Sequence, residues 1–220
     1  MIPKLQVALD NMTTEEALSS VKLYGDVIDI IEVGTILCVA EGMAPVRILR
    51  SLYEDKIILA DIKGADAGSV LAKLCYDAGA TWITAICSAD VETMKGMLKT
   101  AHTYDNHRDV QIELYGEWTF ELAQKWLEAG LSQVVYHRSR DAQAAGKSWG
   151  ESDVLKVKTL SEMGFKVTIT GGLEIEDLHL FKDYPVYCII AGRSIRDAKD
   201  PRQAALDFKT AINQLWNKQT

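Results

Sequence analysis

The sequence contains no apolar run as long as the roughly 18 residues that a membrane-spanning helix needs. Its first residues, MIPKLQVALD, enter a strand-like pattern directly, without the basic region and apolar stretch of a signal peptide. It has only four cysteines, Cys38, Cys75, Cys87 and Cys188, and they form no C-x-x-C pair. We therefore expect a cytoplasmic protein with reduced thiols, no membrane contact and no zinc site built from cysteines.

Clusters of lysine and arginine are also missing. The chain has 24 Lys and Arg residues against 31 Asp and Glu, a net charge of −7, with the two signs interspersed. This balance argues against nucleic acid or a membrane surface as the main partner, because both favour clustered positive charge. No linker or low-complexity run divides the 220 residues, and 48% of them are hydrophobic. We therefore predict a single folded domain over residues 1–220.

What the sequence does contain is an alternation of strand-like and helix-like segments from end to end. The helix-like segments 69–78, 120–129 and 153–163 each end at a glycine, and Pro201 opens a last helix over 202–216. Alternating strands and helices imply parallel strands joined by right-handed crossovers. Eight such units predict a (β/α)8 barrel, or TIM barrel, with a doubly wound open sheet as the alternative. The strand-like segments are 5–10, 29–35, 56–63, 82–87, 109–115, 133–139, 166–172 and 186–193.

The segment ILADIKGADAG carries three charged residues at the end of a buried strand. Its first four residues are apolar without alternation, which is typical of a strand buried on both faces. Asp61 and Lys63 are two residues apart, so they point to the same face of an extended strand, and Asp66 follows closely. Buried charges cost several kcal/mol each, about the penalty seen in proteins, unless they are paired or bound. The cluster predicts a functional site, with a structural ion pair as the alternative.

The active site of a (β/α)8 barrel lies at the C-terminal ends of its strands. Polar residues of this chain fall at most of the predicted strand ends, and their convergence on one mouth predicts an active site there. Taken singly, some could have structural roles instead: Asp10 could cap a helix, Glu32 could pair with Lys63, and His137 could be a satisfied core histidine. The residues at these strand ends are Asp10, Glu32, Asp61, Lys63, Glu113, His137, Arg140, Thr170, Gly172, Gly192 and Arg193.

The last two strand ends, VTITGG and IIAGRS, have the composition of a phosphate site. We call Gly172, Gly192 and Arg193 the glycine cradle. Glycines let backbone N–H groups approach an anion closely, and a guanidinium adds a bidentate contact. Barrels often bind phosphate at these two strand ends, so we predict a phosphate here, with ordinary tight turns as the alternative.

Glu32 and Asp61 offer hard oxygen ligands at the predicted mouth. Two carboxylates completed by waters and substrate oxygens suit Mg²⁺ better than a protein cage for Ca²⁺. Lys63 beside them could stabilise a developing anion or transfer a proton, and Glu113 and His137 could position and protonate. We therefore predict Mg²⁺ as the cofactor.

With these motifs the sequence resembles a known family, the 3-keto-L-gulonate-6-phosphate decarboxylases of the orotidine-5′-monophosphate decarboxylase superfamily. The resemblance spans nearly the whole chain. The element Asp61-x-Lys63-x-x-Asp66 is shared across the superfamily and several chemistries, whereas VVYHRSRDAQAAG is much narrower. The other motifs that carry it are LQVALD, DIIEVGTILCVAEG, ILADIKGADAG, DVQIEL, VTITGG and IIAGRSIRDA.

The resemblance implies a role for each predicted site residue. Glu32 and Asp61 correspond to Mg²⁺ ligands, and Lys63 and Asp66 to the pair that stabilises the transition state. In this family the Asp66 position reaches across a homodimer interface into the partner's site. Substrate-binding positions correspond to Asp10, Thr170 and the glycine cradle, with the phosphate at Gly172, Gly192 and Arg193. Residues that bind substrate and manage protonation correspond to Glu113, His137 and Arg140.

The implied reaction is the Mg²⁺-dependent decarboxylation of 3-keto-L-gulonate 6-phosphate, a small sugar phosphate, to L-xylulose 5-phosphate and CO₂. It passes through an enediolate and belongs to L-ascorbate or related sugar-acid catabolism. One rival is a 3-hexulose-6-phosphate synthase, which adds formaldehyde to ribulose 5-phosphate and shares the D-x-K-x-x-D element. The synthases lack equivalents of Glu113, Arg140 and Thr170, which favours the decarboxylase. The second rival is a non-catalytic sugar-phosphate sensor, which would not need the four charged residues Glu32, Asp61, Lys63 and Asp66.

Overall fold

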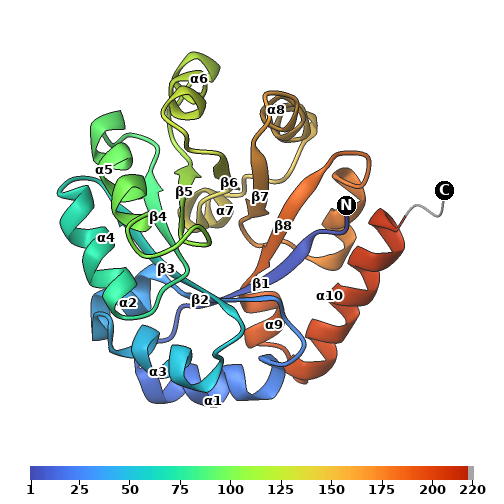
Figure 1. Cartoon of the computed structure of the whole chain (residues 1–220). Helices are drawn as coiled ribbons and strands as arrows, with labels where there is room; N and C mark the ends of the chain where they lie inside the picture. Colours follow the sequence, from blue (N-terminus) through green and yellow to red (C-terminus); the bar gives the residue numbers. More distant parts are fainter. Residues whose placement is uncertain (218–220) are drawn as a thin grey trace.

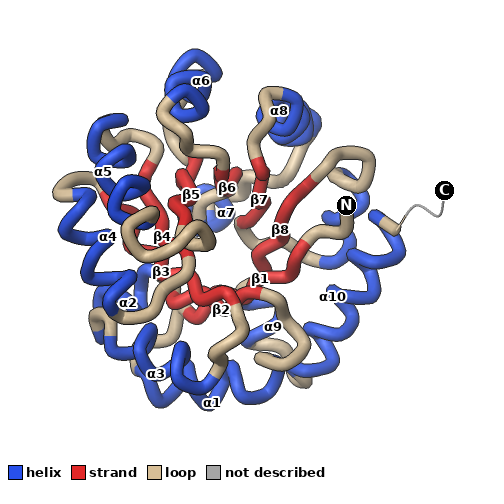
Figure 2. Tube along the Cα trace, in the orientation of Figure 1, coloured by secondary structure: helices blue, strands red, loops and turns tan. Residues whose placement is uncertain are grey.

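Eight parallel strands form a closed barrel in the computed structural model, which describes residues 1–217 (Figures 1 and 2). Each strand pairs with its neighbours in chain order, and β1 closes the ring by pairing with β8. The predicted (β/α)8 barrel is therefore confirmed, and the open sheet is wrong. Residues 218–220 of the predicted domain lie outside the described residues. The strands are β1 Lys4–Leu9, β2 Ile30–Val33, β3 Ile57–Gly64, β4 Trp82–Ile86, β5 Asp109–Leu114, β6 Gln133–His137, β7 Lys166–Thr170 and β8 Val186–Ala191.

Helices surround the barrel, as Figure 1 shows. The glycines predicted as helix stops, Gly79, Gly130 and Gly164, follow α4, α6 and α8 with positive φ angles. None of the helices among residues 1–217 is long and apolar enough to span a membrane. The helices are α1 Thr14–Tyr24, α2 Thr35–Glu41, α3 Ala44–Leu52, α4 Gly68–Asp77, α5 Val91–Ala101, α6 Phe120–Glu128, α7 Arg140–Ala144, α8 Glu151–Glu162, the 3₁₀ helix η1 Ile175–Leu180, α9 Arg193–Arg196 and α10 Pro201–Trp216.

The main core lies between the strands and the helices, and side chains of alternating strand positions fill the barrel itself. On β2, Glu32 lines the cavity at the mouth, so Ile30, two residues earlier, also faces inward. Ile30 packs with Leu59, Trp82 and Cys188 in one buried cluster. A second small cluster, made of Ala8, Val135 and Ile190, lies where Ala8 and Ile190 line the cavity. The barrel interior is therefore packed below the mouth, and the cavity opens at its C-terminal end.

Seven of the eight predicted strands end one or two residues earlier than the sequence suggested, and only β3 ends later, at Gly64. Thr35 and Arg193, the last residues of two predicted strands, are instead the first residues of α2 and α9, and Arg140, just after the predicted strand 133–139, is the first residue of α7. The Ser139 hydroxyl accepts a hydrogen bond from the Ala142 amide and so begins α7. Short helices therefore start directly at the barrel mouth, and their first residues line the cavity.

The segment that follows β3 is held by a close contact between α4 and α5. A Cβ added at Gly68 would lie 2.2 Å from the Thr93 carbonyl oxygen, so only glycine fits here. Gly96 faces the same interface, but a Cβ there would meet the movable Ser69 hydroxyl at 2.9 Å. The α4–α5 contact fixes the start of α4, two residues after Asp66.

We expect Gly68→Ala to destabilise the protein by about 1–3 kcal/mol, the usual cost of overpacking. The added methyl group meets a backbone carbonyl that cannot move without shifting α5. Urea unfolding of this variant beside Gly96→Ala measures the effect. The Gly96 variant serves as the matched control and should change stability by less than about 1 kcal/mol, because a side-chain hydroxyl can rotate away and alanine favours the helix. Equal stability of the two variants would contradict the expectation.

Candidate active site

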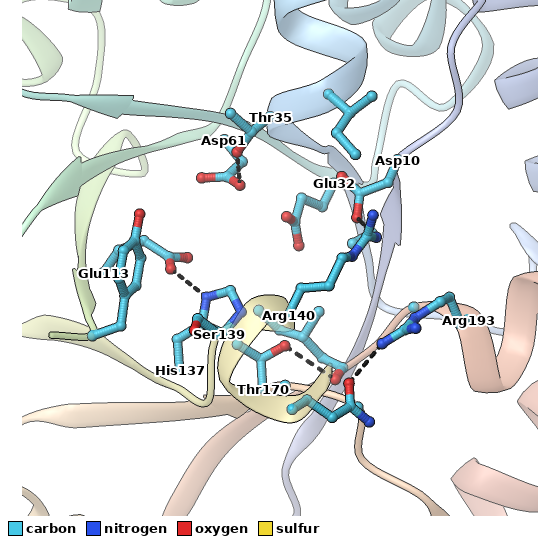
Figure 3. A pocket seen from close by; sticks show the side chains of 18 of the residues that line it. Asp10, Glu32, Thr35, Asp61, Glu113, His137, Ser139, Arg140, Thr170 and Arg193 are labelled. Carbon is cyan, nitrogen blue, oxygen red and sulfur yellow. Dashed lines mark hydrogen bonds and ion pairs between the residues drawn. The ribbon is translucent and has the colours of Figure 1, made fainter. Parts of the chain in front are cut away.

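One cavity of about 340 Å³ opens at the C-terminal ends of the strands. Figure 3 shows its side chains converging from elements far apart in the sequence. Of the twelve residues predicted for the site, eleven line this cavity, and Asp66 is the exception. The predicted residues in the lining are Asp10, Glu32, Asp61, Lys63, Glu113, His137, Arg140, Thr170, Gly172, Gly192 and Arg193.

Asp61 is the most heavily hydrogen-bonded carboxylate of the cavity. Its Oδ1 accepts from the Thr84 hydroxyl at 2.6 Å, and its Oδ2 accepts from the Thr35 hydroxyl at 2.5 Å. Lys63 forms an ion pair with the same Oδ2, and its Nζ also donates to the Thr35 oxygen at 2.8 Å. Two threonines therefore fix the Asp61–Lys63 pair. Sequence reasoning missed both, because a threonine at a strand end or helix start has many structural uses.

The backbone of Lys63 is unusual. Its φ angle is +45°, a conformation that side chains other than glycine rarely adopt. The pairing register between β3 and β4 shifts over Ala60 and Gly64, and the Lys63 amide donates to the Thr84 hydroxyl at 2.9 Å. Ala67 also has a positive φ, +52°. Strained backbone of this kind persists only where its surroundings enforce it, and it often occurs at functional sites.

The electrostatics of the mouth depend on Lys63. Burial alone would lower the pKa of its ammonium, but the carboxylates of Glu113, Asp61 and Glu32 together raise it. Burial raises the pKa of Asp61, yet the charge of Lys63 and hydrogen bonds from Lys63, Thr35 and Thr84 outweigh this and lower it. Both groups are therefore charged at neutral pH, so Lys63 acts as a fixed cation.

Glu32 is the buried carboxylate whose negative charge is least well balanced by neighbouring positive charge. Burial, followed by the charges of Asp61 and Asp10, raises its pKa well above the ordinary range. The hydrogen bond from the Gln6 amide at 2.7 Å and the charge of Lys63 offset only part of this. A divalent cation beside Glu32 and Asp61 would relieve the repulsion between them.

Glu113 and His137 form a pair on adjacent strands. The His137 Nδ1 lies 2.7 Å from Glu113 Oε2, and the buried carboxylate fixes the orientation of the ring (Figure 3). The Tyr115 ring packs edge-on against the imidazole, with 5.5 Å between centroids. Since Nδ1 is engaged, Nε2 is the nitrogen left to exchange a proton with a molecule in the cavity.

The α7 helix carries two contacts across the mouth. Arg140 pairs with Asp10 at 3.2 Å, which joins α7 to the end of β1. The Gln143 side-chain oxygen accepts from Arg193 at 2.6 Å, and a Cβ added at Gly172 would overlap the Gln143 amide. Gln143 therefore lies against the glycine cradle. Nothing in the sequence pattern distinguished it from a solvent-exposed helix residue.

Asp66 lies outside the cavity of its own chain. Its side chain is exposed, on the segment between β3 and α4, and it does not belong to the cavity lining. The four cysteines are free, as predicted. Among residues 1–217, no group of three or more His, Cys, Asp or Glu side chains is arranged to hold a metal ion.

We expect Glu32→Gln to raise the melting temperature at neutral pH by about 2–4 °C, the shift that about 1 kcal/mol gives in a domain of this size. The pKa of Glu32 is raised in the folded chain, so this group favours folding below its ordinary pKa, and the benefit is lost as the pH rises through the folded value. Glutamine avoids that loss, so the gain over wild type should shrink toward about pH 4.5. Thermal unfolding measured from neutral pH down to about pH 4.5 checks this expectation, with the exposed Glu117→Gln as control. A gain independent of pH would be inconsistent with this cause.

Comparisons with known proteins agree with this geometry. The sequence profile of the family described as orotidine 5′-phosphate decarboxylase / HUMPS matches residues 3–208. The 3-keto-L-gulonate-6-phosphate decarboxylase UlaD of Salmonella paratyphi B is 58% identical over 215 residues, which cover 98% of this chain and 99% of that protein.

Solved structures show the same relation. A KGPDC from Streptococcus mutans, crystallised in complex with a sugar phosphate, has a TM-score of 0.97 and 47% identity, covering 98% of this chain and 100% of its own. A 3-hexulose-6-phosphate synthase from Salmonella typhimurium has a TM-score of 0.89 and 27% identity, covering 96% of this chain and 99% of its own. The chain therefore belongs to the orotidine 5′-phosphate decarboxylase / HUMPS family.

Proposed function

We propose that this protein decarboxylates 3-keto-L-gulonate 6-phosphate to L-xylulose 5-phosphate and CO₂ in a Mg²⁺-dependent reaction. The observation that carries the proposal is a single cavity that Lys63, three buried carboxylates and the glycine cradle line together. The 58% identity over nearly the full chain to a decarboxylase of that name supports the same substrate. The enzyme would act in L-ascorbate or related sugar-acid catabolism.

The two sides of the cavity match the two ends of a phosphorylated sugar acid. Figure 3 shows Arg193 across the cavity from Asp61 and Glu113. An anionic phosphate suits the amides and guanidinium of the glycine cradle, and the reacting carboxylate end then faces Lys63. Binding energy from the remote phosphate positions the reacting end.

Mg²⁺ fits the donors that this chain supplies. Glu32 and Asp61 are buried, hard oxygen ligands whose mutual repulsion a cation would offset. Two carboxylates with waters and substrate oxygens are the usual set for Mg²⁺, which rarely occupies an all-protein cage. When bound, Mg²⁺ would act as a Lewis acid toward the oxygen on which negative charge develops.

The residues of the chain account for the two chemical steps. When the bond between C1 and C2 of the β-keto acid breaks, CO₂ leaves and its bonding electrons delocalise onto the C3 oxygen as an enediolate. Lys63 is a fixed cation, and it stabilises this charge without accepting a proton. His137, oriented by Glu113, then delivers a proton to C2, directly or through water, which discharges the enediolate and gives L-xylulose 5-phosphate.

We also propose a cytoplasmic homodimer in which Asp66 completes the partner's site. Asp66 is exposed and lies outside the cavity of its own chain, so a role for it in an active site requires the cavity of another copy. The α4–α5 contact at Gly68 would hold Asp66 in place for this role. Four free thiols suit a reducing compartment.

The synthase reaction is the rival chemistry, since it needs the same metal and a similar enediolate. The identity of 27% to a synthase, against 58% to a decarboxylase, favours decarboxylation. A sugar-phosphate sensor would not need a buried cation among carboxylates, which is costly to fold.

We expect Lys63→Ala to lower the turnover of 3-keto-L-gulonate 6-phosphate by at least ~100-fold, the usual scale for a central electrostatic group. A coupled assay of CO₂ release with Mg²⁺, and after its removal by EDTA, measures this. The control is Lys95→Ala, an exposed lysine paired with Glu92, which should retain full activity. Release without metal would refute the mechanism. A wild type that releases no CO₂ would refute the substrate, and formaldehyde with ribulose 5-phosphate would be tested next.

We expect Gln143→Glu to raise the KM for the phosphorylated substrate by about 10-fold or more, the effect of about 1.4 kcal/mol. The new carboxylate would lie beside Arg193 and against Gly172, where it competes with the phosphate for the guanidinium. Gln143→Ala removes the contact without adding charge and should change KM much less. Steady-state kinetics of both variants test this expectation. Equal KM values for Gln143→Glu and Gln143→Ala would show that Gln143 does not lie at the phosphate.

A further inference from the structure

Arg138 is a buried arginine that lies behind the active-site cavity. Its residue is 9% exposed, and it is absent from the lining of that cavity. The guanidinium lies over the Trp149 ring, 4.9 Å from the ring centroid. Its hydrogen bonds go to three peptide carbonyls and not to a carboxylate: Nε donates to Gly171 at 2.9 Å, Nη2 to Gly172 at 3.0 Å and Nη1 to Lys147 at 3.1 Å.

The two contacts with Gly171 and Gly172 constrain the loop after β7. Nε and Nη2 form one edge of the planar guanidinium, so two successive carbonyls must point the same way to reach it. In an extended chain successive carbonyls point in opposite directions. The loop meets the requirement with positive φ angles at both residues, +118° and +60°. A Cβ at Gly171 would also lie 2.2 Å from the Arg138 carbonyl oxygen, so the loop lies directly on Arg138.

The opposite ends of these two peptides face away from Arg138. The described chain has no cis peptide bond, so each N–H points opposite to the carbonyl of its own peptide. The N–H groups concerned belong to Gly172 and Leu173. Within residues 1–217, neither donates to another group of the chain. Gly171 and Gly172 line the cavity while Arg138 and the buried Leu173 do not, so the Gly172 amide borders the mouth and the Leu173 amide lies next to it.

We propose that Arg138 is a positioning residue that shapes the anion-binding half of the active site from behind. By holding two carbonyls on one guanidinium edge, it directs the Gly172 amide, with that of Leu173 beside it, toward the substrate phosphate. Its third hydrogen bond, to the Lys147 carbonyl, ties the same loop to the segment that follows α7. The α7 helix itself carries Arg140 and Gln143. The inference rests on the proposed phosphate position and adds a residue that never contacts the substrate.

The direct test is the affinity for inorganic phosphate, measured by calorimetric titration of the wild type, Arg138→Met and Arg138→Lys. Lysine retains the charge but lacks the planar fork. We expect both variants to bind phosphate about 10-fold more weakly or worse, as expected from one or two lost hydrogen bonds to a charged group. The KM for 3-keto-L-gulonate 6-phosphate should rise in parallel, with a much smaller change in kcat.

Arg108→Met is the matched control. Arg108 is also packed on aromatic rings, with its guanidinium 5.7 Å from the Tyr76 centroid and 5.8 Å from that of Tyr104, and it donates to Asp105 at 3.1 Å. It is not part of the active-site lining, so its loss should reduce thermal stability and leave the phosphate affinity unchanged. If Arg138→Met does not fold, Arg138→Lys alone decides.

Three other results of the phosphate titration would overturn the proposal, and each would point to a different cause. Variants that bind phosphate as tightly as the wild type would show that Arg138 only packs against Trp149. Wild-type affinity in Arg138→Lys with weak binding in Arg138→Met would show that charge, and not the fork, matters. A wild type that binds no phosphate and turns over no substrate would overturn the proposed function itself.

Discussion

The ammonium group of Lys63 among three buried carboxylates is the interaction on which the rest of the site depends. Asp61, Glu113 and Glu32 raise the pKa of Lys63, and in return Lys63 keeps Asp61 ionised. The left-handed backbone of Lys63, the β3–β4 register shift and the hydroxyls of Thr35 and Thr84 all hold this arrangement. Glu32 remains under-compensated, because burial and the charges of Asp61 and Asp10 raise its pKa well above the ordinary range.

Much of the fold could be predicted, because its signals are local. Buried strands such as 57–60 read as continuous apolar runs, and glycines marked the ends of α4, α6 and α8. Charged residues at strand ends identified the mouth, since parallel strands bring their C-terminal ends together. The strand ends themselves were predicted too long, because Thr35, Arg140 and Arg193 open short helices whose start depends on local capping and tertiary contacts.

The supporting residues of the site could not be predicted from the pattern. Thr84 has the composition of any strand residue, and its role appears only when β4 lies beside the end of β3. The motif HRSR offers two arginines two residues apart, and nothing in the letters says that Arg138 is buried against Trp149 while Arg140 reaches Asp10. Such assignments depend on contacts between segments far apart in the chain. The role of Asp66 at a partner's site stays a prediction.

The barrel closes between β1 and β8, so the site can be completed only late in the synthesis of the chain. β1 pairs with both β2 and β8, so the ring cannot be completed until nearly the whole chain is available. The three buried carboxylates near Lys63 lie on β2, β3 and β5, whereas the glycine cradle lies directly after β7 and β8. A nascent chain emerging from the ribosome therefore holds its buried charges before it holds the strands that enclose them. Long-range closure of this kind is slow, and the exposed edges of β1 and of the growing sheet need protection until synthesis ends.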